Sequence, residues 1–313
     1  MSLEGTVVKS TGSWYKVETD QKELLDARLK GKIRLKGLKS TNPVAVGDRV
    51  EFKEEQGEYL IQSILPRKNY IIRRSINLSK QTQIIAANVD QIFLVICLKE
   101  PRTFMGFVDR FLVGAEAYRI PVVLVYNKVD LIQTIEEIAE LEKWLKIYDL
   151  AGYEQLQISA IKKQGIEAIK ELMEGKVSIF SGHSGVGKST LINRLDKRLD
   201  LRVNDVSDTH QSGKHTTTFA EMFELDFGAK IIDTPGIKGF GNVNLEKQHL
   251  SHYFPEMRLR INECKYNNCI HIDEPNCAIK EAVRAGDISE SRYLNYRSIY
   301  EEDETESYRK KDY

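Results

Sequence analysis

One octet constrains the fold of this chain more than any other stretch. Residues 182–189 read Gly-His-Ser-Gly-Val-Gly-Lys-Ser, which fits the phosphate-binding pattern G-x-x-x-x-G-K-[ST]. An apolar, strand-like run at 177–180 leads into it, and a helix-like run at 189–195 leaves it. In that setting the glycines turn backbone N–H groups inward and the helix N-terminus adds a positive dipole. The octet predicts an α/β fold around a phosphate site, with a plain glycine turn as the alternative.

The pattern also predicts a role for individual residues of the loop. Lys188 is expected to reach the β- and γ-phosphates, and the Ser189 hydroxyl to ligate Mg²⁺. The nucleotide-binding residues predicted here are Gly182, His183, Ser184, Gly185, Val186, Gly187, Lys188, Ser189 and Thr190.

Length and composition bound the rest of the chain. At 313 residues, about two or three domains are expected. The formal net charge is zero, so any basic surface must be local. Apolar runs such as 92–98 are too short to span a bilayer, and the first residues lack signal-peptide features. We therefore expect a cytoplasmic protein, whose cysteines are metal ligands or core residues rather than disulfides.

Residues 1–68 are predicted to be all-β. Their short strand-like runs, separated by turn signals, suit a five-stranded OB-type barrel. Six basic residues and no acid lie between positions 28 and 39, which fits either a nucleic-acid surface or a solvated strand edge. The strand-like runs are 5–9, 13–19, 49–53 and 58–64.

After a linker-like stretch at 66–70, residues 69–240 alternate between strand-like and helix-like runs. This alternation predicts a mostly parallel sheet with helices on both faces, and ligands beyond the carboxyl ends of the strands. Phe107, Phe111 and Leu112 keep helical spacing and are expected in the core. The strand-like runs are 91–98, 122–126, 155–159, 177–180, 220–227 and 230–233; the helix-like runs are 104–118, 135–148 and 166–173. Residues 241–313 change to short helical runs and form a predicted third domain.

The tetrapeptide Asn127-Lys128-Val129-Asp130 follows an apolar strand and fits N-K-x-D, the guanine-reading element of GTPases. A carboxylate at Asp130 can accept from both guanine N1–H and the exocyclic amine, a pattern that adenine does not offer. Asn127 is expected to tie loops together, and the Lys128 stem to lie over the base. Ser159 and Ala160, after the next strand, resemble the accompanying backbone contact to the guanine carbonyl.

Asp233-Thr234-Pro235-Gly236 fits D-x-x-G after another apolar strand. Asp233 is expected to hold Mg²⁺ through water, and the Gly236 N–H to sense the γ-phosphate. In the polar stretch 204–218, either Thr216 or Thr217 should ligate Mg²⁺, and the sequence does not choose between them. That stretch is a candidate order–disorder switch.

The order of the motifs is unusual. In ordinary GTPases the phosphate loop comes first and N-K-x-D comes late. Here Asn127–Asp130 precedes Gly182–Ser189, and Asp233–Gly236 comes last. The order predicts a circularly permuted GTPase fold, which can keep the site intact because chain ends can be rejoined at surface loops.

The catalytic water has no obvious partner in the expected place. Ras-like enzymes carry Gln directly after D-x-x-G, where this chain has Ile237. His215 is the candidate for positioning the water, and a solvent-exposed loop histidine is the alternative. Potassium-stimulated GTPases carry Asn at the fourth loop position; here it is Gly185, which leaves potassium activation open.

Cys264, Cys269, His271 and Cys277 make a Cys₃His set within fourteen positions. Three thiolates and an imidazole predict one structural zinc ion, held in a closed tetrahedral site. Free buried cysteines or a disulfide are the alternatives. Cys97, inside an apolar strand, is expected to be a core residue.

Together these motifs resemble the RsgA-type circularly permuted GTPases over nearly the whole chain. The resemblance implies an OB-fold domain (1–68), a permuted GTPase domain (69–240) and a C-terminal zinc domain (241–313). It implies a late assembly factor of the small ribosomal subunit, which binds GTP and GDP with Mg²⁺, contacts rRNA and is stimulated by the subunit. It also supports His215 in catalysis. We further expect a monomer that does not bind membranes.

Two other functions stay open at this point. One is a GTP-dependent RNA- or protein-binding switch with little turnover, which Ile237 permits. The other is a nucleic-acid-binding module whose GTPase part is only structural. The sequence does not indicate the rRNA region contacted or the assembly step.

Overall fold

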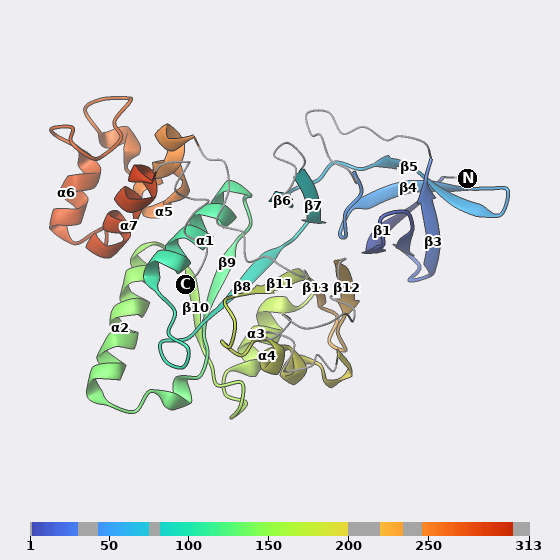
Figure 1. Ribbon diagram of the computed structural model, residues 1–313, viewed down its shortest axis with the longest axis horizontal. Helices are drawn as coiled ribbons and strands as arrows, with labels where there is room; N and C mark the ends of the chain where they lie inside the picture. The colour runs from blue at the N-terminus through green and yellow to red at the C-terminus, as the bar shows by residue number, and fades with distance from the viewer. Residues whose placement is uncertain (1, 31–42, 75–81, 200–219, 234–245, 303–313) are drawn as a thin grey trace, which may run out of the picture.

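The computed structural model describes residues 2–30, 43–74, 82–199, 220–233 and 246–302. Within these ranges the strands form one continuous eleven-stranded sheet and a separate two-stranded hairpin, followed by a C-terminal helical unit, residues 246–302 (Figure 1). The sheet order is β10-β9-β8-β11-β13-β12-β1-β2-β3-β5-β4.

The N-terminal end of the sheet closes on itself, because β1 pairs with both β2 and β4. The resulting five-stranded barrel encloses its own core, which includes Val7, Tyr15 and Phe52. The predicted barrel is thus confirmed, with one strand that the sequence did not single out. That strand is β3, whose apolar alternation is short and whose last residues begin the basic run. The barrel strands are β1 (Leu3–Ser10), β2 (Tyr15–Thr19), β3 (Leu24–Leu29), β4 (Arg49–Glu55) and β5 (Glu58–Ile64).

The predicted linker at 66–70 does not lead directly into βα alternation, which corrects the sequence interpretation. A hairpin of β6 (Tyr70–Arg74) and β7 (Thr82–Ala87) comes first. This connector is anchored, since Arg67 makes a buried ion pair with Asp48 at 2.6 Å.

The α/β region carries β10, β9, β8, β11 and β13 in parallel. The antiparallel strand β12 lies between β13 and β1 of the barrel. Alternate residues of β8 face two different cores: Ile92 and Leu94 pack with α1 and α2, whereas Phe93 and Val95 pack with α3 and α4. Helices therefore cover both faces, as predicted. The elements are β8 (Gln91–Ile96), α1 (Met105–Ala117), β9 (Val122–Tyr126), α2 (Ile135–Leu150), β10 (Glu154–Gln157), α3 (Ile166–Met173), β11 (Val177–Ser181), α4 (Lys188–Leu195), β12 (Glu221–Glu224) and β13 (Lys230–Asp233).

Two details differ from the sequence prediction. The strand expected over 220–227 is only β12, because the chain turns at Asp226–Gly228. Phe107 on α1 is not a core residue but 36% exposed, since it faces the phosphate loop rather than the sheet. Phe111 and Leu112 are buried as expected.

The C-terminal helical unit packs on α1, at the opposite end of the molecule from the barrel (Figure 1). Val113 of α1 belongs to the core of this unit. In the described part of the chain no helix combines the length and apolar character needed to cross a bilayer. The helices are η4 (Lys247–Tyr253), α5 (Pro255–Arg258), η5 (Ile261–Glu263), α6 (Ala278–Ala285) and α7 (Glu290–Glu301).

Candidate nucleotide site and metal centre

The phosphate loop joins the end of β11 to the start of α4, as the octet predicted. Two of its glycines are required by their surroundings. A Cβ at Gly182 would lie 2.2 Å from the Val95 carbonyl oxygen, and a Cβ at Gly187 would lie 2.4 Å from Asn127 Nδ2. Both also have positive φ, +140° and +93°. A side chain at either position would force the loop out of shape.

Lys188 begins α4 and turns back over the loop. Its Nζ donates to the carbonyl oxygens of Gly182 at 2.7 Å and His183 at 2.8 Å. The ammonium group is therefore held at the loop, where phosphate oxygens are expected. Ser189 and Thr190 follow in the first turn of the helix and are partly exposed.

Asn127 lies behind the loop and joins it to the next strand end. Its Nδ2 donates to the Val186 carbonyl at 2.8 Å, and its Oδ1 accepts from the Ala160 N–H at 3.1 Å. The side chain is buried. This is the tie between loops that the N-K-x-D pattern led us to expect, and it fixes the phosphate loop relative to the Ser159–Ala160 turn.

The proposed base-reading groups meet at the carboxyl ends of β9 and β10. Lys128 has a left-handed conformation, with φ 64°, and its Nζ donates to the Glu100 carbonyl. Asp130 stands half-buried in the next turn. Ser159 Oγ accepts from the Lys162 N–H at 3.2 Å. The parallel strands bring together motifs that are far apart in the sequence.

Part of the predicted site lies outside the described residues. Asp233 is exposed at the end of β13, the neighbour of β11 in the sheet. Of the site residues discussed above, those outside the described ranges are His215, Thr216, Thr217, Gly236 and Ile237.

Sequence reasoning missed the contacts behind His183. Its Nε2 lies 2.6 Å from Thr103 Oγ1, and its ring meets the Phe107 ring edge-on with centroids 5.8 Å apart. Burial, the largest cause, lowers the pKa of His183, helped by the charges of Lys188 and Lys128 and opposed by the Ser184 carbonyl. No sequence pattern connects positions 103 and 183.

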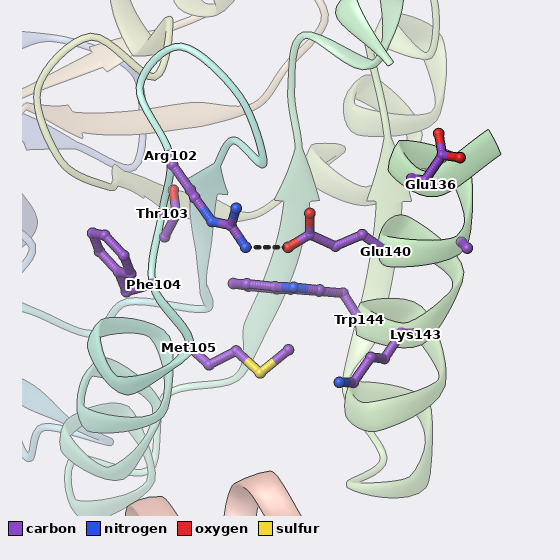
Figure 2. Close-up of a pocket in the computed structure, with 9 residues that line it drawn as sticks. Arg102, Thr103, Phe104, Met105, Glu136, Glu140, Lys143 and Trp144 are labelled. Atoms are coloured by element: carbon purple, nitrogen blue, oxygen red, sulfur yellow. Dashed lines mark hydrogen bonds and ion pairs between the residues drawn. The ribbon is translucent and has the colours of Figure 1, made fainter. Parts of the chain in front are cut away.

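The loop that carries Thr103 also lines an open pocket of about 490 Å³ between itself and α2. Figure 2 shows Arg102 and Glu140 pointing toward one another above the Trp144 ring, with Met105 below it. The pocket is separate from the phosphate loop, since the residues that line it come from 102–105 and from α2.

The Cys₃His residues converge in the C-terminal helical unit. The ligand atoms of Cys264, Cys269, His271 and Cys277 all lie within 4.8 Å of one another, and His271 Nδ1 is 3.4 Å from Cys277 Sγ. A tetrahedron with Zn–S bonds of about 2.3 Å has edges of about 3.8 Å, so the set fits zinc. Burial raises the pKa of the Cys269 thiol to about 12, which a cation must overcome to bind the thiolate.

Residues outside the predicted set hold the backbone of this cluster. The hydroxyl of Tyr293 donates to the His271 carbonyl at 2.7 Å, and that of Tyr296 to the Ile270 carbonyl at 2.6 Å. The Glu274 carboxylate accepts from the N–H groups of Ile270 and Ile272 at 2.7 and 3.0 Å. The aromatic spacing on α7 was visible in the sequence, but not its target.

Comparison with known proteins agrees with the geometry. The family model described as RsgA GTPase matches residues 64–243, and that of the RsgA N-terminal domain matches residues 4–59. This chain belongs to the RsgA family of GTPases. The circularly permuted fold and the GTPase class of the enzyme follow from that membership together with the strand order.

Curated RsgA relatives match over nearly their whole length. A protein of Christiangramia forsetii, named small ribosomal subunit biogenesis GTPase RsgA, is 52% identical over 306 residues, covering 96% of this chain and 97% of that protein. A protein of Bacteroides fragilis with the same name is 50% identical over 308 residues, covering 98% of this chain and 99% of that protein.

Two solved structures share the architecture. YjeQ from Thermotoga maritima superposes with a TM-score of 0.74 at 35% identity, covering 96% of this chain and 98% of that one. YloQ, described as a circularly permuted GTPase, gives a TM-score of 0.76 at 26% identity, with coverages of 100% and 98%.

Proposed function

We propose that this chain hydrolyses GTP as an assembly factor of the small ribosomal subunit, in the cytoplasm and as a monomer. The observation that carries the proposal is the match, over almost the full length of both chains, to proteins named small ribosomal subunit biogenesis GTPase. The domain bounds that go with this proposal are 1–68, 69–240 and 241–313.

The residue roles are proposed from the motifs and their placement. Asp130 selects guanine, and Lys188 and the loop N–H groups hold the phosphates. Ser189, Asp233 and one of Thr216 and Thr217 would hold Mg²⁺, which would neutralise charge developing on the phosphates. His215 would position the attacking water, and the Cys₃His set would hold zinc. The guanine contact also includes Ser159 and Ala160, and Gly236 senses the γ-phosphate.

We propose that the barrel and the C-terminal helical unit contact rRNA, and that the subunit stimulates hydrolysis. On the barrel, Trp14 is 41% exposed, with the Arg28 guanidinium 3.7 Å from its ring centroid. Aromatic and guanidinium planes of this kind stack on nucleic-acid bases, which supports RNA contact at this surface.

The first test is GTP hydrolysis by the purified protein, with and without small ribosomal subunits, with ATP as the control nucleotide. We expect GTP-specific turnover that the subunit accelerates. Slow hydrolysis that the subunit leaves unchanged would instead favour the binding switch. His215→Ala should lose the stimulated turnover and keep nucleotide affinity, and an unchanged rate would remove His215 from the role.

The guanine assignment has its own test. Asp130→Asn replaces an acceptor of two N–H groups by an amide that can donate, so GTP affinity should fall at least about tenfold while xanthosine triphosphate gains. Equilibrium titration with both nucleotides measures the change. Retained GTP selectivity would refute the assignment of Asp130.

A further inference from the structure

Helix α1 contacts both the phosphate loop and the C-terminal helical unit. Phe107 in its first turn and Thr103, two residues before the helix, meet the loop at His183. Its middle and end meet α7 and η4, and Glu116 pairs with Arg258 of α5. Thirteen helical residues span about 20 Å, so one short, continuous helix joins the two contacts. Neither contact belongs to the nucleotide or zinc residues proposed above, apart from His183 itself.

At the loop end, the hydrogen bonds define one arrangement of donors. The Thr103 N–H donates to the Cys97 carbonyl at 2.7 Å, and Thr103 Oγ1 accepts from the Cys97 N–H at 3.0 Å. His183 Nδ1 lies 3.0 Å from the Ser184 carbonyl, which can only accept, so Nδ1 carries the proton. Nε2 is then the acceptor, and the Thr103 hydroxyl donates to it. Thr103 is 1% exposed, so this hydroxyl has little access to water as a substitute partner.

A second contact fixes the same region of the loop. The Cys97 thiol donates to the Val186 carbonyl at 3.4 Å. Cys97, directly after β8, and Thr103, two residues before α1, therefore hold the phosphate loop at Val186 and His183, one on each side of Gly185.

At the other end, Asp109 of α1 is buried against the C-terminal helical unit. It accepts from Arg292 at 2.7 Å, and also from Asn295 and the Tyr148 hydroxyl. Burial by itself lowers the pKa of Arg292. The negative charges of Asp109 and Glu256 together have the larger effect and hold that pKa well above the usual range. The position of α1 is thus set by charged groups that would be left unpaired if the unit shifted.

We propose that Thr103 and His183 are positioning residues. They couple the conformation of the phosphate loop to the docking of α1 on the C-terminal helical unit. The loop then takes its nucleotide-binding shape only while α1 stays docked on that unit. A partner that moves the unit changes nucleotide affinity and hydrolysis without touching the nucleotide. The part of this inference that concerns the ribosomal subunit rests on the proposed function, and the part that concerns affinity does not.

The test is a double-mutant cycle read by equilibrium binding of a fluorescent, non-hydrolysable GTP analogue to the whole protein. Thr103→Val keeps nearly the same shape but removes the hydroxyl, and with it both the donor to His183 and the acceptor of the Cys97 N–H, so binding should weaken about tenfold. Thr103→Ser keeps the hydroxyl and should stay within about twofold of the wild type. Equal affinity of Thr103→Val, Thr103→Ser and the wild type would overturn the proposal.

The second substitution of the cycle is Asn295→Ala, at the other end of α1. It removes one hydrogen bond to Asp109 at a partly buried position. Alone it should change the affinity about threefold, and in the Thr103→Val background it should change nothing further. Additive effects of the two substitutions would show that α1 does not carry the coupling. If Thr103→Val melts at a lower temperature than Thr103→Ser, His183→Ala replaces it in the same cycle with the same two outcomes.

A hydrolysis measurement distinguishes failure of this inference from failure of the proposed function. Single-turnover GTP hydrolysis is measured with and without small ribosomal subunits for the same variants. Absent stimulation in the wild type would refute the proposed function, while the binding cycle would still decide the coupling. Stimulation in the wild type that Thr103→Val loses and Thr103→Ser keeps would support both.

Discussion

The phosphate loop and the Cys₃His cluster are built in opposite ways. In the loop, backbone N–H groups are the expected ligands, and side chains such as Asn127 and Thr103 stand behind them. In the cluster, side chains face inward, and Tyr293 and Glu274 hold the backbone behind them. A backbone site is therefore damaged by adding atoms at a glycine, whereas a side-chain site is damaged by removing one ligand.

The sharpest way to separate the two is to remove a thiolate. Cys277→Ser should release the zinc and unfold the C-terminal helical unit, since structural zinc contributes about 10–16 kcal/mol in small zinc domains. Elemental analysis and thermal unfolding measure both effects. Cys97→Ala, a buried cysteine outside the cluster, is the control and should retain full zinc content. Full zinc content in Cys277→Ser would contradict the assignment.

The buried charges between α1 and the C-terminal helical unit come next. Arg292→Met leaves Asp109 and Glu256 buried without their cation and should lower the free energy of unfolding by about 3–5 kcal/mol. Urea unfolding measures it. Arg297→Ala on the same helix removes an ion pair with Glu301 whose side chains are 41% and 58% exposed, and it should cost less than about 0.5 kcal/mol. Equal losses for the two variants would show that burial of the pair is unimportant.

In the loop, Gly187→Ala should abolish tight nucleotide binding and spare the zinc. The added Cβ would meet Asn127 and break the tie to the loop, so GTP affinity should fall at least about a hundredfold, or about 2.7 kcal/mol. Gly175→Ala is the matched control, because its φ is also positive, +68°, and nothing lies within 4 Å of its Cβ. Loss of GTP binding in both variants would indicate backbone strain alone.

The smallest expected effect is a pH dependence at His183. Its pKa is lowered in the folded protein, so the folded state resists a proton that the unfolded chain accepts as pH falls through about 6.5. Stability should therefore decline below that pH and level off once the folded pKa is passed. Melting temperatures between pH 7.5 and pH 5, taken at about half-unit steps, should decline less in His183→Gln than in the wild type. Parallel curves would show that His183 does not titrate differently on folding.

The arrangement of the nucleotide-binding motifs could be predicted from the sequence because each motif follows an apolar strand. Parallel strands bring such ends together, so the meeting of Asn127, Ala160 and Val186 could be expected. The hairpin β6–β7 and strand β3 were missed because their apolar patterns are short. The domain bounds and the roles of the nucleotide and metal residues stay predictions, and those of His215, Thr216, Thr217 and Gly236 concern residues outside the described ranges.

By itself the sequence determined which motifs are present and their permuted order: a G-x-x-x-x-G-K-[ST] loop, an N-K-x-D tetrapeptide and a Cys₃His set. These depend on residue type at short spacing, which a chain carries wherever it folds. Only the tertiary structure decided that the segment carrying α1 contacts both the phosphate loop, through Thr103 and His183, and the C-terminal helical unit, through Asp109 and Arg292. Contacts between positions 80 or 183 residues apart leave no local pattern, because the packing of helices on the sheet alone places them together.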